Sequence, residues 1–516
     1  MAKDCNQVNL AATSAANPVG PLHLLMLGAL ALAALLWAAS VVLDMQPTQT
    51  VSYLLPLGFY GLATAVFVWR RLAKGGYSVF HIPVFFSLAN FLRFGLMTLA
   101  IYADPSLLHP FFHGDYQQIR VALLYFAIGM LAYWAGCSLV SAKGEKLGSQ
   151  NRCHDEPSKD VEGGANLPVL WLVYLLTLGV RAYEVYTTGT NRSLAAFGAR
   201  NENVAEIQFF SIADMVGTWC FIVFAIERFS HPAERFLRGL FRVVFVIECF
   251  FGLLTGMKSA LLMPFFLAAT LFALINKKLK KSLCFAPFLA LIVIYPLFNS
   301  ARQLPGEGGK GIAVVQRWAA AVGQAQERTL DTSEWLTSGW DSTVQRLALL
   351  QEMALAMNLG DRAEWLKGDE RWWMLPLYPF VPRYIWPSKP ILLKGQRFSV
   401  ATGSTENNSL AITIPGDLYL EFGFLGLLIG MSILGMLGQW LTNMISGPLR
   451  KESLFMYTAI FWSLVFLESD VFGLVTGLMK SLVMLWVFVK LIYVPRHRIQ
   501  LSPPSQLGGF ACGEKA

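Results

Sequence analysis

Charged side chains are scarce in this sequence. Asp, Glu, Lys and Arg together make up 14% of its 516 residues, whereas hydrophobic residues make up 55%. A soluble domain carries roughly 25% charged residues, so the composition excludes an ordinary soluble globular protein. The net charge of +8 does not indicate nucleic-acid binding, because the basic residues are dispersed among short segments and no nucleic-acid-binding motif is present. The composition therefore predicts an all-α polytopic membrane protein.

The sequence also lacks a clear signal-peptide cleavage site. Its first apolar run, residues 22–43, is longer than the core of a signal peptide and is not followed by a small-residue cleavage motif. We therefore expect this run to be retained as the first membrane span.

Long apolar runs are the dominant feature of the sequence. A helix needs about 20 apolar residues to cross the hydrocarbon core of a bilayer. Twelve runs approach that length, and the seventh and eighth are separated only by "TGMKS" at 255–259. The predicted spans are 22–43, 51–69, 80–102, 119–141, 167–186, 209–227, 240–255, 259–276, 283–300, 416–441, 453–468 and 471–492.

The placement of Lys and Arg predicts the orientation. Basic residues concentrate in alternate loops, whereas loops 44–50 and 103–118 contain none. Because cytoplasmic loops carry the excess of Lys and Arg, both termini are predicted to be cytoplasmic. The chain then divides into nine spans within 1–300, a large external segment at 301–415, three spans within 416–492 and a cytoplasmic tail, 493–516. None of the seven cysteines falls in an external loop, which excludes a disulfide-stabilised outer domain.

The external segment 301–415 is predicted to be structured. Residues 313–330 and 340–360 place apolar side chains three and four apart, which is typical of amphipathic helices. Asp341 or Ser342 is expected to cap the second helix. Seven of the fifteen tryptophans lie in this segment, either at the membrane interface or against sugar rings.

One stretch of this segment, "FVPRYIWPSKP" at 380–390, combines three prolines with Arg383 and Lys389. Because proline restricts the backbone, the stretch predicts a rigid loop that presents two cations to an anion. Anchoring of Arg383 to a lipid phosphate is the alternative interpretation.

Several ionisable residues lie inside predicted spans. Arg93 and Glu248 are mid-span, whereas Arg181 and Asp214 lie near outer ends. Such residues are costly within a bilayer and mark either functional sites or paired charges. A structural Arg93–Glu248 pair is one interpretation. As a set, the charges near the outer leaflet predict the wall of a site that opens to the outer side.

Several stretches together resemble a known family. "FVPRYIWPSKP", followed by "PGDLYLEFGFLGLLIGM" at 415–431, is similar to the bacterial oligosaccharide repeat-unit polymerases, the Wzy-type O-antigen and exopolysaccharide polymerases. "GMKSALLMP" at 256–264, "FNSAR" at 298–302 and "QRLALL" at 345–350 fit the same family. The resemblance covers roughly residues 250–430.

The resemblance implies an architecture like that of GT-C glycosyltransferases in the bacterial inner membrane, with the active site facing the periplasm. It implies an enzyme that joins undecaprenyl-diphosphate-linked repeat units into an O-antigen, capsule or exopolysaccharide. No metal, nucleotide sugar or other cofactor is expected. The expected partners are lipid-linked oligosaccharides, membrane lipid, a chain-length regulator and a flippase of the same pathway.

The chemistry implied by the resemblance needs cations for a departing diphosphate and a carboxylate for the attacking hydroxyl. Asp417 and Glu421 are the leading base candidates, since residues four apart share one helical face, and Glu406 is a third. Alternatively, Asp417 interacts only with the dipole of its helix. The diphosphate-binding candidates are Arg181, Arg200, Lys258, Arg302, Arg383, Lys389 and Arg397; the candidates for sugar or interface contact are Tyr384, Trp386, Trp372 and Trp373.

Two other functions fit part of the pattern. An O-antigen ligase has a similar architecture, but such ligases are expected to carry a functional histidine in the large loop, and 301–415 contains none. A transporter or flippase suits twelve spans with both ends inside. Against it, the sequence predicts no matching pair of interrupted helices in its two halves.

Overall fold

The computed structural model describes residues 47–73, 78–103, 116–150, 164–188, 204–254, 258–276, 410–446, 449–465 and 467–493, and parts of 319–403, chiefly 347–359, 377–381 and 394–403. These residues fold into α-helices, with one π-helical segment and no β-strand among them. The predicted spans 22–43 and 283–300 lie outside the described residues. In chain order the helices are α2 (Pro47–Ala73), α3 (Ile82–Asn90), η1 (Phe91–Leu96), α4 (Met97–Ala103), α5 (Tyr116–Gln150), α6 (Leu167–Thr188), α8 (Val204–Ser230), α9 (Arg235–Leu254), α10 (Lys258–Asn276), α14 (Leu350–Met357), α16 (Lys394–Ala401), α17 (Ile414–Met444), α18 (Lys451–Val465) and α19 (Val471–Ile492).

Seven helical stretches in the described part of the chain are long and apolar enough to cross a membrane. One of them, Ile82–Ile101, runs through α3, η1 and α4, and the others lie in α2, α5, α6, α8, α17 and α19. The predicted spans 240–255, 259–276 and 453–468 are also helical, as α9, α10 and α18, but these helices are not among the seven. The chain is therefore an all-α protein with membrane-spanning helices.

The outer surface of the helices carries large apolar side chains. On α6, Leu172, Leu176 and Tyr183 are each at least 60% exposed, and they share one face of the helix. On α19, Trp486 is 63% exposed. Contiguous exposed apolar surface is costly in water, so these faces are suited to contact with lipid.

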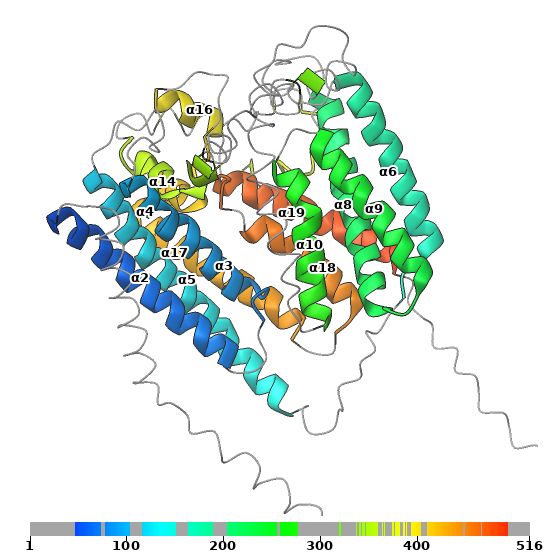
Figure 1. Ribbon diagram of the computed structural model, residues 1–516, viewed down its shortest axis with the longest axis horizontal. Helices are drawn as coiled ribbons and strands as arrows, with labels where there is room; N and C mark the ends of the chain where they lie inside the picture. The colour runs from blue at the N-terminus through cyan, green and yellow to red at the C-terminus, as the bar shows by residue number, and fades with distance from the viewer. Residues whose placement is uncertain are drawn as a thin grey trace, which may run out of the picture.

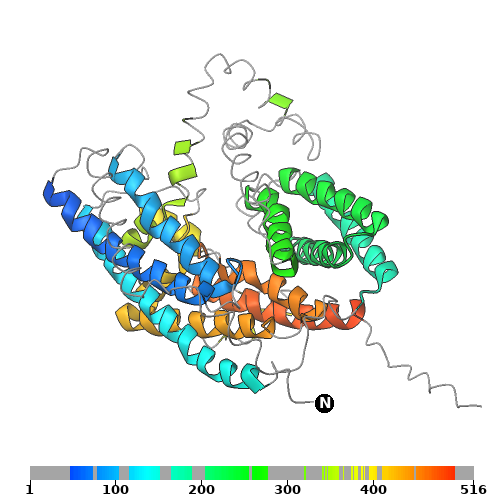
Figure 2. The same cartoon turned by 60° about the horizontal axis from the view of Figure 1, so that its bottom comes forward.

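The helices form two packed groups. The first core lies among α2, α3, η1, α5, α14 and α17, and the second among α6, α8, α10, α18 and α19, with α9 packed against it. Figure 1 shows the two groups side by side, and Figure 2 shows the orange and red helices α18 and α19 of the second group next to the first, where they contact α17.

The closest helix pair, α5 with α17, depends on two glycines. A Cβ atom added to Gly435 would lie 2.0 Å from the carbonyl oxygen of Tyr133, and one added to Gly136 would lie 2.1 Å from that of Ser432. Small residues allow backbones to approach in this way, as in other membrane helix pairs.

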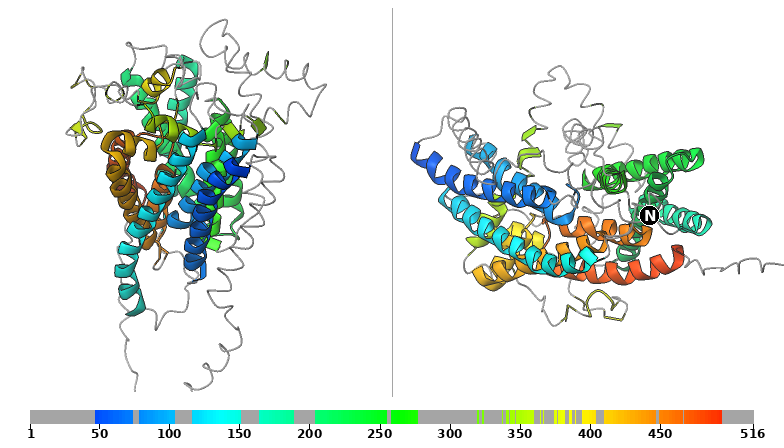
Figure 3. Two further views of the ribbon diagram at one scale, coloured as in Figure 1. Left: turned by 90° about the vertical axis from the view of Figure 1, so that its left-hand side faces the viewer. Right: turned by 90° about the horizontal axis from the view of Figure 1, so that it is seen from below.

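Polar contacts join the helix ends that were predicted to lie on the same side. The N–H of Asn166 donates to the carbonyl of Ile492 at 2.9 Å, and Lys451 pairs with Glu227 at 2.7 Å, all at ends predicted to be cytoplasmic. At the opposite end, the N–H of Ile414 donates to the carbonyl of Leu467 at 2.9 Å. Helix α16 lies at this second end, away from the last turns of α5 (Figure 3). These contacts bring together Asn166 with Ile492, Lys451 with Glu227, and Ile414 with Leu467, whereas the topology and orientation of the spans stay predictions.

Helix α17 is interrupted, which corrects the prediction of one continuous span at 416–441. Gly423 has φ 65° and ψ −161°, a conformation that favours glycine. A Cβ atom added to Gly430 would lie 2.4 Å from the side chain of Leu418, although twelve residues of straight helix would separate them by about 18 Å. The first segment, 414–422, therefore folds back against the remainder of α17, with Gly426 and Gly430 at the contact.

Candidate functional site

Helices α14 and α16, within 301–415, lie at the end of the helix bundle where α17 begins. Helix α14 contacts α5 and α17 and buries Leu350, Met353 and Ala354. The predicted helix at 340–360 is therefore present in part, but most of α14 is buried rather than interfacial. Residues 340, 341, 343–345 and 347 are also helical, so Asp341 lies within a helical stretch rather than at its N-cap, and Ser342 lies outside the described residues.

A buried ionic cluster lies beneath this segment. The amine of Lys394, the first residue of α16, lies 2.6 Å from Oδ1 of Asp417 and also pairs with Oε1 of Glu421. The side chains of Lys394 and Asp417 are 2% and 0% exposed, whereas that of Glu421 is 10% exposed. The prediction that Asp417 and Glu421 share one face is confirmed, since both reach the same ammonium group.

The local fold explains why these side chains converge. Thr413 caps α17 and accepts a hydrogen bond from the N–H of Gly416 at 3.2 Å. Asp417 lies in the first turn, and its Oδ2 accepts the N–H of Val471 at 2.8 Å. Asp470 caps α19 in turn, by accepting from the N–H of Gly473. Asp417 thus connects the beginnings of α17 and α19 to α16.

The two carboxylates stabilise the charged form of the lysine. Burial by itself lowers the pKa of the Lys394 amine, but the charges and hydrogen bonds of Asp417 and Glu421 outweigh burial, so the pKa lies above the ordinary lysine value. The cluster carries one positive and two negative charges. One carboxylate can therefore accept a proton while the other keeps Lys394 paired.

The stretch "FVPRYIWPSKP" approaches this site through aromatic contacts. The amine of Lys389 lies 4.4 Å from the ring centroid of Tyr378 and donates to the carbonyl of Val381 at 2.9 Å. The Tyr378 ring packs edge-on against Phe472, the residue after Val471, with centroids 5.3 Å apart. Trp386 lies farther out, with its ring centroid 6.5 Å from that of Tyr378. Lys389 is buried, so its ammonium is held in place rather than extended into solvent.

A second ion pair lies on the same side of the bundle. Arg93, in the π-helical segment η1, pairs with Glu468 in the turn between α18 and α19. The expected Arg93–Glu248 pair is therefore wrong. A π-helical segment is rare and is often found at functional positions.

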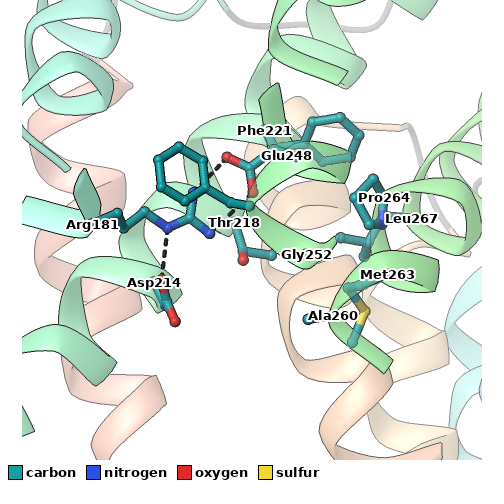
Figure 4. Close-up of a pocket in the computed structure, with 11 residues that line it drawn as sticks. Arg181, Asp214, Thr218, Phe221, Glu248, Gly252, Ala260, Met263, Pro264 and Leu267 are labelled. Atoms are coloured by element: carbon teal, nitrogen blue, oxygen red, sulfur yellow. Dashed lines mark hydrogen bonds and ion pairs between the residues drawn. The ribbon is translucent and has the colours of Figure 1, made fainter. Parts of the chain in front are cut away.

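Arg181 belongs to a separate site. Its Nε donates to Asp214 at 2.6 Å, and its two terminal nitrogens donate to Glu248 at 2.7 and 3.2 Å. The hydroxyl of Tyr174 donates to the same Glu248 carboxylate at 3.1 Å. Arg181, Asp214 and Glu248 come from α6, α8 and α9 and line a cavity of about 250 Å³ (Figure 4). The structure therefore does not bring Arg181 to the Lys394 cluster.

The remaining candidates divide between the described and the other residues. Arg397 lies one turn after Lys394 on α16 and is partly buried, and Lys258 is the first residue of α10. Several candidates lie outside the described residues: Arg200, Arg302, Glu406, Arg383, Tyr384, Trp372 and Trp373.

Sequence reasoning missed Lys394 as the partner of both carboxylates. No local pattern signals this pairing, because Lys394 lies in α16 and the two acids lie in α17. In the described part of the chain, no group of three His, Cys, Asp or Glu side chains is placed to hold a metal ion.

Comparison with models of protein families, with curated proteins and with solved structures finds no match for this chain.

Proposed function

We propose that this protein is a membrane glycosyltransferase that joins undecaprenyl-diphosphate-linked oligosaccharide units at the outer face of the bacterial inner membrane. The proposal includes twelve spans and cytoplasmic termini. The observation that carries it is the buried Lys394–Asp417–Glu421 cluster, at the helix end that the Lys/Arg bias assigns to the outside. The resemblance at 380–390 and 415–431 supplies the substrate class.

The proposed step transfers a growing chain to a sugar hydroxyl of the incoming unit. The hydroxyl oxygen attacks the anomeric carbon of the chain, and the bond from that carbon to the diphosphate oxygen breaks. The diphosphate leaves with the electron pair, and the hydroxyl proton passes to a base. The step therefore needs one carboxylate that substrate can reach and cations near the leaving diphosphate.

Glu421 is assigned as the base. Its side chain is partly exposed, whereas Asp417 is fully buried and its oxygens contact Lys394 and the N–H of Val471. Asp417 is assigned as a positioning residue, which keeps Lys394 paired after Glu421 becomes neutral. The cluster then passes from a net charge of −1 to zero.

Arg397 and Lys389 are assigned to the diphosphate among the described residues. Arg397 shares α16 with Lys394, and Lys389 is connected to the start of α19 through Tyr378 and Phe472. An Arg guanidinium binds phosphate oxygens in pairs, so Arg397 suits this role better than Lys389. Arg302 and Arg383 remain candidates of the same kind from the sequence.

Polymer length in whole cells tests this proposal. A deletion strain is complemented with wild type, Glu421→Gln, Arg397→Ala or the exposed-site control Glu234→Gln, with expression matched by blot. We expect the first two variants to lose long polymer while single units still appear outside, and the control to match wild type. Normal polymer from Glu421→Gln would contradict the assignment of the base.

A transporter of lipid-linked oligosaccharides is the second candidate. The interruption of α17 at Gly423, two residues after Glu421, favours it, because transporters often bind substrate at broken helices. Nothing in the sequence indicated this interruption, although the expectation concerned a matching pair of interrupted helices in the two halves, and α17 supplies one. In the same experiment, loss of single units from the outside would favour the transporter.

A further inference from the structure

The cavity among α6, α8, α9 and α10 has no role in the proposed transfer step. Its volume of about 250 Å³ lies just below the range of roughly 300–1,000 Å³ typical of ligand pockets, so it suits a small ligand. Its wall is polar on one side, with Arg181, Asp214, Thr218 and Glu248. The rest of the wall is largely apolar, with Phe221, Phe251, Gly252, Ala260, Met263, Pro264 and Leu267.

The guanidinium of Arg181 is held firmly within the wall. It makes three hydrogen bonds to Asp214 and Glu248, and its carbon lies 5.2 Å from the ring centroid of Phe251. Gly217 makes this position possible, because a Cβ atom there would lie 2.9 Å from a terminal nitrogen of Arg181. Arg181 therefore acts as a fixed part of the site and orients both carboxylates.

The other polar groups of the described wall are hydrogen-bond acceptors. The Asp214 side chain is 26% exposed, and a carboxylate has about four acceptor positions. Pro264 lies inside α10 and has no N–H, so it cannot bond the carbonyl of Ala260 in the preceding turn. That carbonyl oxygen lies beside Gly252, where a Cβ atom would approach it to 2.6 Å. The hydroxyl of Thr218 adds a further oxygen to the same wall.

The charge of this wall selects the ligand. Arg181 is offset by Asp214 and Glu248, so the described lining carries one surplus negative charge. A diphosphate would meet two carboxylates and a guanidinium that already binds both, which is unfavourable. A cation that donates hydrogen bonds meets an acceptor wall, and the ring of Phe221 offers it an aromatic surface (Figure 4).

We propose that this cavity binds a primary ammonium group carried on a small organic moiety. The ammonium donates to Asp214, Thr218 and the Ala260 carbonyl, and the attached carbon skeleton packs against Met263 and Leu267. An amino sugar and the head group of an aminophospholipid both supply this chemistry. The inference is independent of the proposed glycosyl transfer, because it uses none of the residues of the Lys394 cluster.

Titration calorimetry on the purified full chain in detergent tests the proposal with matched pairs of probes. Glucosamine and ethanolamine carry the ammonium group, whereas glucose and ethanol are the same skeletons without it. We expect binding of the first pair only. Equal binding of glucose, competition by pyrophosphate, or equal competition by sodium ions at the same concentration would each overturn the proposal.

Two variants locate the binding in the cavity. Asp214→Asn keeps an oxygen for Nε of Arg181 but removes the charge, and we expect it to weaken glucosamine and ethanolamine binding by roughly 30-fold or more. Pro264→Ala restores a helical N–H for the Ala260 carbonyl, and we expect it to weaken binding about tenfold without loss of folding. The control Glu234→Gln removes an exposed charge elsewhere and is expected to bind as wild type. Unchanged binding in Asp214→Asn would refute the site.

The two sources of the ammonium are separated in nanodiscs. Phosphatidylethanolamine discs are compared with phosphatidylcholine discs, whose head group has no N–H donor. If ethanolamine lipid abolishes glucosamine binding and choline lipid does not, the ammonium comes from lipid. If binding is equal in both discs and still requires Asp214, it comes from the sugar.

Discussion

Replacement of Lys394 by methionine is expected to lower the unfolding free energy more than the other substitutions considered below. Methionine fills a similar volume but leaves Asp417 and Glu421 as adjacent carboxylates without their cation. The Lys394 and Asp417 side chains are 2% and 0% exposed, so water cannot screen them. Loss of one partner from a buried ion pair costs about 3–5 kcal/mol of unfolding free energy, and we expect Lys394→Met to lie in that range.

The assay is equilibrium unfolding in mixed micelles with graded SDS, followed by far-UV circular dichroism. Lys490→Met is the matched control, because Lys490 is an exposed lysine in the last turn of α19. Neutralisation of both acids, as Lys394→Met/Asp417→Asn/Glu421→Gln, is expected to recover most of the loss. An unfolding free energy for Lys394→Met within about 0.5 kcal/mol of the control would refute the reasoning.

Three further predictions concern pH and backbone geometry. Burial lowers the pKa of His81 from 6.5 to about 4, so the unfolded chain binds a proton at a higher pH than the folded chain. The unfolding free energy is therefore expected to fall as the pH is lowered from 6.5 to 4, and to fall less in His81→Gln. The pKa of Lys394 is raised in the folded chain, so its effect on stability has the opposite pH dependence. Its stabilisation is complete below the unfolded lysine pKa of about 10.4 and is lost as the pH rises through the folded pKa. Lys394→Met is expected to show no such loss of stability at alkaline pH. Gly423→Ala places a side chain at φ 65° and is expected to lower the unfolding free energy by about 1–3 kcal/mol. Gly403→Ala also places a side chain at positive φ but lies outside α17, and it is expected to leave polymer length unchanged.

Much of the fold follows directly from hydropathy. Apolar runs of sufficient length predicted the long helices that the structure describes, whereas α16 was not predicted and α14 was expected only from its amphipathic pattern. Hydropathy did not predict the break in α17, because glycines at 423, 426 and 430 are equally compatible with a straight membrane helix. The backbone angles of Gly423 and the contact of Leu418 with the position of Gly430 reveal the fold-back.

The sequence predicted the two acids of the candidate site but not their cationic partner. The spacing of Asp417 and Glu421 placed both acids on one face, which helical geometry requires whatever the partner. Their partner Lys394 lies in a different helix and is separated from them by a loop, so no local pattern indicates it. For Arg181 the sequence predicted a function that the structure does not support. Its charge and depth suggested an anion site, but Asp214 and Glu248, from two other helices, pair with its guanidinium.

In the proposed reaction, Glu421 acts as the base in the joining of lipid-linked units. The direct measurement uses wild type and Glu421→Gln, each purified into nanodiscs and supplied with the lipid-linked units that accumulate in the deletion strain. Product length is read on a gel, with Glu234→Gln as control. We expect a ladder of longer products from wild type and the control, and none from Glu421→Gln. Failure of wild type to extend the units, or an equal ladder from Glu421→Gln, would contradict the proposal.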